Sequence, residues 1–187
     1  MNTEDLLRVL RGKLGNLVSF QGVLASDQVR NYIIPEFREN KIAFIANIIE
    51  STDSRLGHWV IFIIAKSPCN IIYFLDSYGL NPHHYSDNFK YFLNKYSKYT
   101  VRKLNKRLQD SDSIVCGLYC AYFIYHISRK SIDFLFHLLK KDFSVNNYKK
   151  NDAYIFSFYS KFLNRRSCQY WKRIDDSNMT FRQCTSL

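Results

Sequence analysis

The sequence predicts an α+β domain in which a central, mostly antiparallel mixed sheet is flanked by helices. Three apolar runs of strand length, rich in β-branched and aromatic residues, follow one another at 41–49, 58–65 and 71–76. Helical patterns dominate the chain after them, and strands followed by helices are typical of the α+β class. With 187 residues, 47% of them hydrophobic, the chain is expected to form one domain over 1–187.

The first expected element is an amphipathic helix over residues 3–13. Its leucines recur at helical spacing: Leu6, Leu7, Leu10 and Leu14. Residues 16–40 follow with a mixed pattern, interrupted by Gly22 and Pro35, and we assign no element to them.

The three apolar runs come next, separated by segments that contain Ser, Asp, Gly, Pro and Asn. Their apolar residues are continuous instead of alternating. Continuous runs indicate central strands that are covered on both faces.

The second half of the chain is mainly helical. After a turn at 79–82, the expected elements are a helix over 84–97, a basic strand over 99–108, a polar loop over 109–113, an apolar helix over 115–129, and helices over 132–141 and 152–165. Ser131 is the expected N-cap of the helix at 132–141, and Asn151 or Asp152 that of the last helix. The polar tail, 167–187, is expected to be poorly ordered.

The charge balance is strongly basic, with 27 Lys and Arg against 16 Asp and Glu, a formal net charge of +11. Such a surplus favours polyanions such as DNA or an acidic partner. The competing interpretation is a solvated basic surface, because the many Lys, Asn, Ile, Tyr and Phe residues are also favoured by A+T-rich coding. The sequence contains no apolar run long enough for a membrane span and begins without a signal-peptide hydrophobic region, so we expect neither membrane insertion nor secretion.

The five cysteines do not predict a metal site. Their odd number and the lack of a short CxxC pair argue against a zinc ribbon or a dense disulfide framework. Cys116 and Cys120 share a helical face at i, i+4, which alone is weak support for a metal. We therefore expect no metal.

Cys116 is the candidate nucleophile. It lies between a polar loop and the start of an apolar helix, where the helix dipole and the free backbone N–H groups favour the reactive thiolate. Gly117 follows it, and a residue without a side chain lets a substrate backbone come close. The alternative is that Cys116 is simply a small buried hydrophobic residue.

His58 is the candidate general base. It starts an apolar run directly after Gly57, and a strand end holds a side chain rigidly while leaving it able to face a cleft. Four other histidines compete for the role: His83, His84, His126 and His137. Two of these lie in a turn and two in helices after Cys116, and none is placed at a strand end near a plausible acid.

Asp76 is the candidate acid that orients His58, because it ends the next apolar run. We expect a simple hairpin with matched ends to bring the ends of neighbouring runs to different edges, so this pairing would require another strand arrangement or a staggered register. An Asp in this position is often only a turn residue.

Gln109 is the candidate donor to an oxyanion. It lies seven residues before Cys116, and a loop of this length can fold back to place the amide beside the thiol. The backbone N–H of Cys116 would be the second donor to a tetrahedral intermediate.

Three segments together resemble the active-site segments of the adenovirus proteinase (adenain) family and of its relatives, the SUMO- and ubiquitin-like-protein proteases. The segments are GHWV, FLDSYG and Q-x6-CGLYCAYF. The resemblance covers roughly residues 3–140. It implies an adenain-like fold with the nucleophile at the N-terminus of a central buried helix, and it assigns the triad to His58, Asp76 and Cys116 and the oxyanion hole to Gln109 and the Cys116 backbone N–H.

The resemblance also leads to expectations about the substrate cleft and about activators. Gly57, Trp59 and Gly117 would line the cleft, although Trp59 is equally well interpreted as core packing. Adenain has Glu where this chain has Asp76, and the Pro-Asn common in the loop before the nucleophile is replaced by Ser111-Asp112. The cysteine that ties adenain to its disulfide-linked activating peptide is missing around Lys98, so the chemistry is expected to need no cofactor, with a non-covalent activating peptide or DNA as the remaining activators.

The function implied by the resemblance is a cysteine endopeptidase that processes viral capsid or core precursor proteins during virion maturation. Its expected location is the virion and the infected host cell, its expected state a monomer, and its expected source a virus, a virophage or a Polinton-type element. Two alternatives remain open. One is a deubiquitinase or SUMO-type isopeptidase, and the other is a non-catalytic basic nucleic-acid-binding protein.

Overall fold

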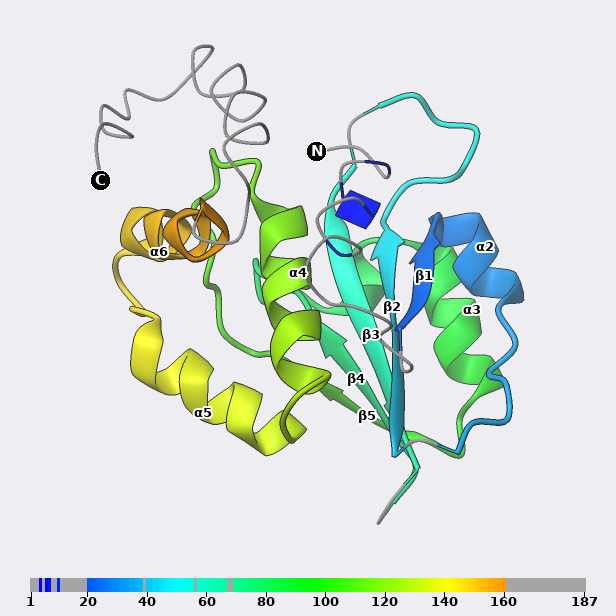
Figure 1. Cartoon of the computed structure of the whole chain (residues 1–187). Helices are drawn as coiled ribbons and strands as arrows, with labels where there is room; N and C mark the ends of the chain where they lie inside the picture. The colour runs from blue at the N-terminus through cyan, green and yellow to red at the C-terminus, as the bar shows by residue number, and fades with distance from the viewer. Residues whose placement is uncertain are drawn as a thin grey trace.

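A five-stranded sheet lies between two layers of helices, as the computed structural model shows (Figure 1). The structure describes residues 4, 6, 7, 10, 20–38, 40–55, 57–66 and 69–160. Helices α2 (Ser26–Asn31) and α3 (Asp87–Lys95) cover one face of the sheet. Helix α4 (Cys116–Ile127) covers the other, with α5 (Ile132–Asp142) and α6 (Tyr148–Ser160) outside it.

The strands follow chain order across the sheet: β1 (Phe20–Leu24), β2 (Lys41–Asn47), β3 (Trp59–Ala65), β4 (Ile71–Leu75) and β5 (Thr100–Lys103). The central pairs, β2 with β3 and β3 with β4, are antiparallel. The outer pairs, β1 with β2 and β4 with β5, are parallel. The expected α+β class with a mixed sheet is therefore confirmed.

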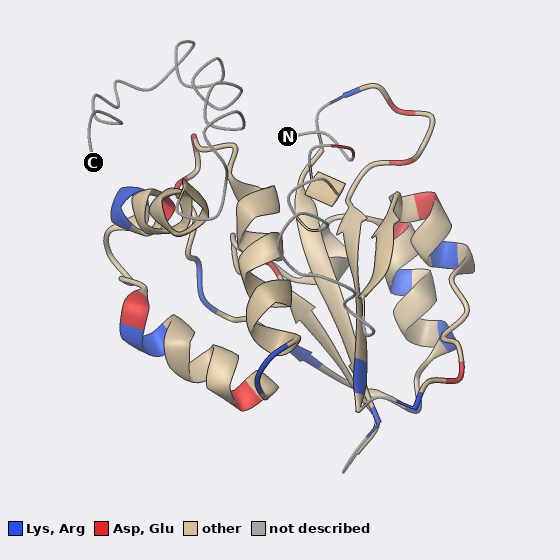
Figure 2. Ribbon diagram, viewed as in Figure 1, with Lys and Arg blue, Asp and Glu red and all other residues tan. Residues whose placement is uncertain are grey.

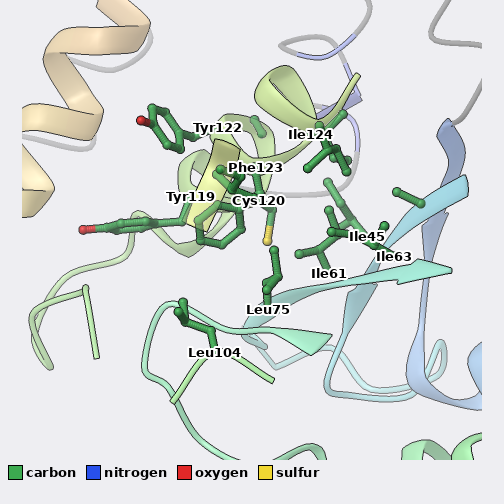
Figure 3. Close-up of a cluster of buried hydrophobic side chains, with 14 of the residues drawn as sticks. Ile45, Ile61, Ile63, Leu75, Leu104, Tyr119, Cys120, Tyr122, Phe123 and Ile124 are labelled. Atoms are coloured by element: carbon green, nitrogen blue, oxygen red, sulfur yellow. The ribbon is translucent and has the colours of Figure 1, made fainter. Parts of the chain in front are cut away.

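The continuous apolar strands are buried on both faces, as their sequences predict. Every residue of β3 and of β4 is buried. Alternate residues such as Ile61 and Ile63 face α4. They form one buried cluster with Tyr119, Phe123 and Ile124 of that helix (Figure 3). Phe62 and the other alternate residues face α3, in a second cluster that contains Phe89 and Phe92. Because both faces are packed, the residues at the ends of β3 and β4 are held in place. The candidate site lies where β3 starts and β4 ends.

The segment 16–40, to which the sequence assigns no element, contains β1 and α2. Both are short and depend on tertiary contacts. Gly22 in β1 has φ 117° and accompanies a register shift, so β1 lacks a regular pattern. Helix α2 begins after Ala25, whose N–H donates to Gln28 Oε1 at 2.8 Å, and it is held by buried Val29. Signals this weak do not stand out in sequence.

Several boundaries differ from the sequence prediction. The strand expected over 99–108 ends at Lys103. The helix expected over 84–97 is the shorter α3, and the 3-10 helix η1 (Pro82–His84) precedes it. Helix α6 begins at Tyr148, four residues before the predicted start, so Asn151 and Asp152 lie within its first turns and do not cap it. Ser131 does cap α5, accepting from Phe134 N at 3.1 Å.

Two predicted segments lie partly or wholly outside the described residues. Within 3–13, the described residues are helical, and Leu6 and Leu10 are buried as predicted. The tail at 167–187, and the end of the helix predicted to reach 165, lie outside the described residues. Among the described residues, no helix is long and apolar enough to cross a membrane.

Candidate active site

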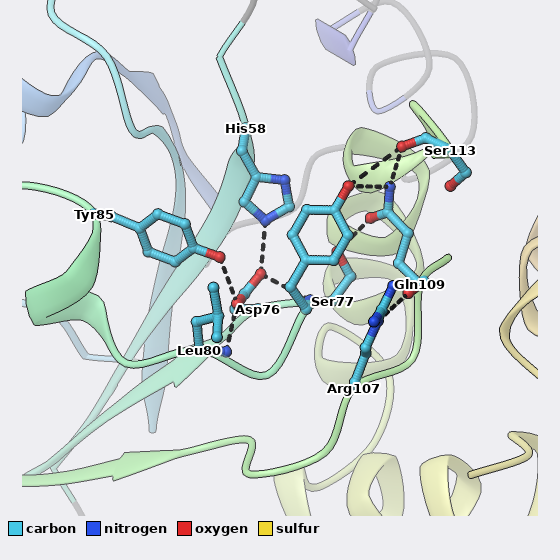
Figure 4. Close-up of polar contacts among 9 residues, drawn as sticks. His58, Asp76, Ser77, Leu80, Tyr85, Arg107, Gln109 and Ser113 are labelled. Carbon is cyan, nitrogen blue, oxygen red and sulfur yellow. Dashed lines mark hydrogen bonds and ion pairs between the residues drawn. The ribbon is translucent and has the colours of Figure 1, made fainter. Parts of the chain in front are cut away.

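The predicted triad residues meet where the start of β3, the end of β4 and the N-terminus of α4 come together. Figure 4 shows His58 beside Asp76. The expectation that a simple hairpin would separate His58 from Asp76 is wrong. Because β3 and β4 are antiparallel, with Ile61 opposite Leu75, the start of one strand lies beside the end of the next. A hairpin with matched ends therefore brings the two residues together.

His58 and Asp76 form a buried ion pair, with 2.6 Å between His58 Nε2 and Asp76 Oδ1. Three more donors reach the same carboxylate. Tyr78 N donates to Oδ1 at 3.0 Å, and Leu80 N and Tyr85 Oη donate to Oδ2 at 2.8 Å each. A carboxylate with these partners is fixed in position, because each of its two oxygens accepts from two donors.

Cys116 is the first residue of α4 and is 8% exposed. The first backbone hydrogen bond of this helix runs from Leu118 N to Val115 O, at 2.9 Å. The N–H groups of Cys116 and Gly117 precede it and belong to the four that a helix N-terminus leaves without an intrahelical acceptor. These groups and the positive end of the helix dipole form an environment that attracts a negatively charged group.

The raised pKa of His58 suits a partner of the Cys116 thiol. Burial alone would lower its pKa, but hydrogen bonds to Asp76 and to Cys116, and the negative charges of both, raise the pKa of His58 to about 9. Since Nε2 is held by Asp76, Nδ1 is the nitrogen left for the thiol. The imidazole therefore favours its protonated form, which stabilises a neighbouring thiolate.

Two tyrosines that sequence reasoning missed complete the surroundings of His58. The Tyr78 ring stacks on the imidazole with centroids 4.6 Å apart, and the Tyr85 ring lies 5.6 Å from it. Burial and the nearby negative charge of Cys116 raise the pKa of Tyr78 to about 12, and burial with Asp76 raises the pKa of Tyr85 well above its usual range. Both phenols therefore stay neutral donors. Tyr78, two residues after Asp76, was available in the segment FLDSYG, but Tyr85 carried no signal.

Gln109 is fully buried beside these groups (Figure 4). Its Oε1 accepts from Ser77 Oγ at 2.6 Å. Its Nε2 donates to Ser113 O at 2.7 Å and, more weakly, to Tyr78 Oη at 3.3 Å. The loop thus folds back on itself through this amide, which has one strong internal acceptor and one long one.

The three residues expected to line the cleft have packing roles in the structure. A Cβ on Gly57 would lie 1.9 Å from Asn47 Oδ1, so glycine permits close approach to the end of β2. Trp59 is 5% exposed and belongs to the same buried cluster as Cys116, which fits the core-packing interpretation. Gly117 is buried in the first turn of α4.

The competing thiol and histidines lack such surroundings. Cys120 is 2% exposed, and burial raises the pKa of its thiol well above the usual value. Of the histidines, His126 packs against Tyr122 with the two rings tilted and their centroids 4.4 Å apart, and burial lowers its pKa. Among the described residues, no group of three or more His, Cys, Asp or Glu side chains could hold a metal ion.

No protein-family model matches this chain, and neither does any curated protein. One similar solved structure is described as "Crystal structure of the de-sumoylating protease"; it is 15% identical, with a TM-score of 0.44, over 84% of this chain and 71% of that chain.

Proposed function

We propose that the protein is a cysteine peptidase that uses Cys116 as nucleophile, His58 as general base and acid, and Asp76 as the orienting acid. The observation that carries this proposal is the buried His58–Asp76 pair, 2.6 Å apart, in contact with a thiol at a helix N-terminus. A nucleophile, a base and a group that orients the base are the parts that covalent hydrolysis of an acyl group requires.

The proposed reaction begins with attack of the Cys116 thiolate on the scissile carbonyl carbon. The resulting oxyanion is stabilised by the backbone N–H of Cys116 and by the Gln109 amide. The second amide hydrogen would exchange its long bond to Tyr78 Oη for one to this oxygen. His58 then gives its proton to the leaving amine, and the C–N bond breaks to leave a thioester. Water, deprotonated by His58, hydrolyses the thioester and regenerates the thiol.

The substrates that we propose are viral capsid or core precursor proteins, cleaved as an endopeptidase during maturation in the virion or the infected cell. The segments GHWV, FLDSYG and Q-x6-CGLYCAYF support this proposal through their resemblance to adenain. The net charge of +11 supports DNA as an activating polyanion.

The test is mapping of the new N-termini that appear when the protein is co-expressed with a candidate capsid precursor. Wild type should generate defined N-termini, and Cys116→Ala should generate none. Cys69→Ala is the matched control, because Cys69 is an exposed cysteine away from the site and its loss should leave the cleavage pattern unchanged.

Two further measurements, labelling by an activity probe and DNA binding, separate the alternatives. If a ubiquitin- or SUMO-type C-terminal activity probe labels Cys116 rapidly while the precursor stays intact, the enzyme is an isopeptidase. If wild type neither cleaves nor labels yet binds DNA with a steep salt dependence, the non-catalytic alternative is correct. Cleavage that persists in Cys116→Ala would refute the proposed nucleophile.

A further inference from the structure

Helix α6 reaches the loop that carries Gln109 through one face of its first turns. Tyr148, Asn151 and Asp152 are spaced at i, i+3 and i+4 and therefore lie on the same side of the helix. Asn151 and Asp152 are 1% and 5% exposed, unusual burial for these residue types. Their polar groups must have partners inside the protein.

These partners lie on both sides of Gln109. The Arg107 guanidinium lies 4.6 Å from the centroid of the Tyr148 ring, and Arg107 Nε donates to Gln109 O at 2.9 Å (Figure 4). Asn151 Nδ2 donates to Leu108 O at 2.9 Å. Three successive residues at 107–109 are thus held, directly or through Arg107, by α6.

Asp152 joins this loop to the helix of the nucleophile. Its Oδ2 accepts from Asp110 N at 3.1 Å, on the far side of Gln109. Its Oδ1 accepts at 2.8 Å from the hydroxyl of Tyr119, a buried residue of α4 three positions after Cys116. A single carboxylate therefore links Gln109's neighbour, the nucleophile helix and α6.

We infer that α6 is a brace for the oxyanion site and that Asp152 is its central positioning residue. This inference rests on the proposed function. Asp152 does not touch the reacting atoms; it holds residues 108–110 against α4, so that the Gln109 amide stays at a fixed place relative to the Cys116 backbone N–H. The helix that the sequence predicts over 152–165 is thereby assigned a positioning role beside the site.

The test compares two reactions of Cys116. Alkylation by iodoacetamide displaces iodide at a saturated carbon, so it depends on the thiolate and forms no oxyanion. Peptide cleavage depends on the thiolate and also on stabilisation of the oxyanion. Asp152→Ala should lower kcat about 10- to 100-fold, as displacement of an oxyanion donor does, while the alkylation rate changes less than about twofold. Asp152→Asn, which keeps the shape but can accept only one of the two bonds, should give a smaller loss.

The matched control is Tyr154→Phe, a hydroxyl deletion on α6 whose partners, Asp142 and Tyr122, lie outside the loop, and which should leave kcat unchanged. Should Asp152→Ala fail to fold, Tyr119→Phe removes the donor to Oδ1 and gives the second measurement. A double variant tests whether the effect of Asp152 is transmitted through Gln109. If Asp152 acts through Gln109, Gln109→Ala with Asp152→Ala should be no slower than Gln109→Ala alone.

Losses that multiply in the double variant, or unchanged kcat in Asp152→Ala, would overturn the inference. So would alkylation that slows in parallel with cleavage, because that would place the effect on the thiolate. Amide hydrogen exchange gives a readout without turnover: residues 108–113 should exchange faster in Asp152→Ala than in Tyr154→Phe, and equal exchange would refute the brace. Absence of peptidase activity in wild type would instead refute the proposed function.

Discussion

At the scale of single residues, Asp76 shows how the site is organised. The residue is 1% exposed. Both carboxylate oxygens accept hydrogen bonds, from backbone N–H groups of the turn that follows β4 and from the Tyr85 hydroxyl. The acid is therefore held independently of His58, and the imidazole is oriented by a carboxylate that cannot rotate away.

The hydroxyl of Tyr85 contributes to this orientation. Tyr85→Phe should lower kcat/KM roughly tenfold, because a hydrogen bond to a charged group contributes about 1.5 kcal/mol or more and Oδ2 would keep only Leu80 N. Steady-state kinetics measures this change. Tyr91→Phe on α3 is the control, since Tyr91 is 50% exposed and its ring contact with Arg30 is kept by Phe. Equal activity of both variants would show that Tyr85 does not position Asp76.

The protonation of His58 predicts the alkaline limit of activity. Its pKa of about 9 lies above the ordinary value of 6.5, so the imidazolium persists through neutral pH and is lost as the pH rises through about 9. A pH profile of kcat/KM should therefore fall on an alkaline limb near pH 9. In Asp76→Asn the limb should move to lower pH, because a partner that raises the pKa is gone. If the alkaline limb stays at the same pH in Asp76→Asn, a group other than His58 is responsible for the limb.

At the scale of elements, the sequence predicts the buried elements best. Strands β3 and β4 and helix α4 follow their apolar runs within one or two residues, because burial on every side produces a strong pattern. Strand β1, at the sheet edge, and the six-residue α2 were missed, since their stability comes from contacts distant in sequence. The start of α6 was misplaced for a related reason. Asn151 and Asp152 resemble caps in sequence, but their side chains bind the Gln109 loop.

The turn after β4 makes a prediction at this scale. Gly79 has φ 71°, and a Cβ there would lie 2.7 Å from the carbonyl carbon of Lys106. That backbone has little freedom to move, because Lys106 Nζ binds Leu139 O and Phe143 O. Gly79→Ala should therefore lower the free energy of unfolding by roughly 3 kcal/mol, from backbone strain and the close contact together.

Gly22→Ala is the control for Gly79→Ala. Gly22 also has positive φ, at 117°, but its Cβ would meet nothing within 4 Å. Denaturant unfolding should show a clearly smaller loss for Gly22→Ala, since it adds strain without a clash. Equal losses would mean that the contact with Lys106 has no part in the effect.

At the scale of the whole molecule, the site depends on segments that are far apart in the chain. The order of β3, β4 and α4 brings together residues 58, 76 and 116, and the residue types at these positions were identifiable from the sequence. The hydrogen bonds that complete the site were not, because Tyr85, Ser113 and Asp152 have no distinctive spacing relative to the triad. Sequence reasoning thus identifies the candidate reactive groups, and folding alone reveals the groups that position them.

The same assembly couples the site to global stability. The folded pKa of His58, about 9, lies above its unfolded value of about 6.5, so its stabilisation is fully present below pH 6.5 and is lost as the pH rises through 9. The difference amounts to about 3 kcal/mol. His58→Gln lacks this titration, so the gap in unfolding free energy between wild type and variant should shrink by about that amount between pH 6.5 and pH 9.5. Urea unfolding at several pH values measures the gap, and a gap that stays constant with pH would contradict a raised pKa for His58 in the folded protein.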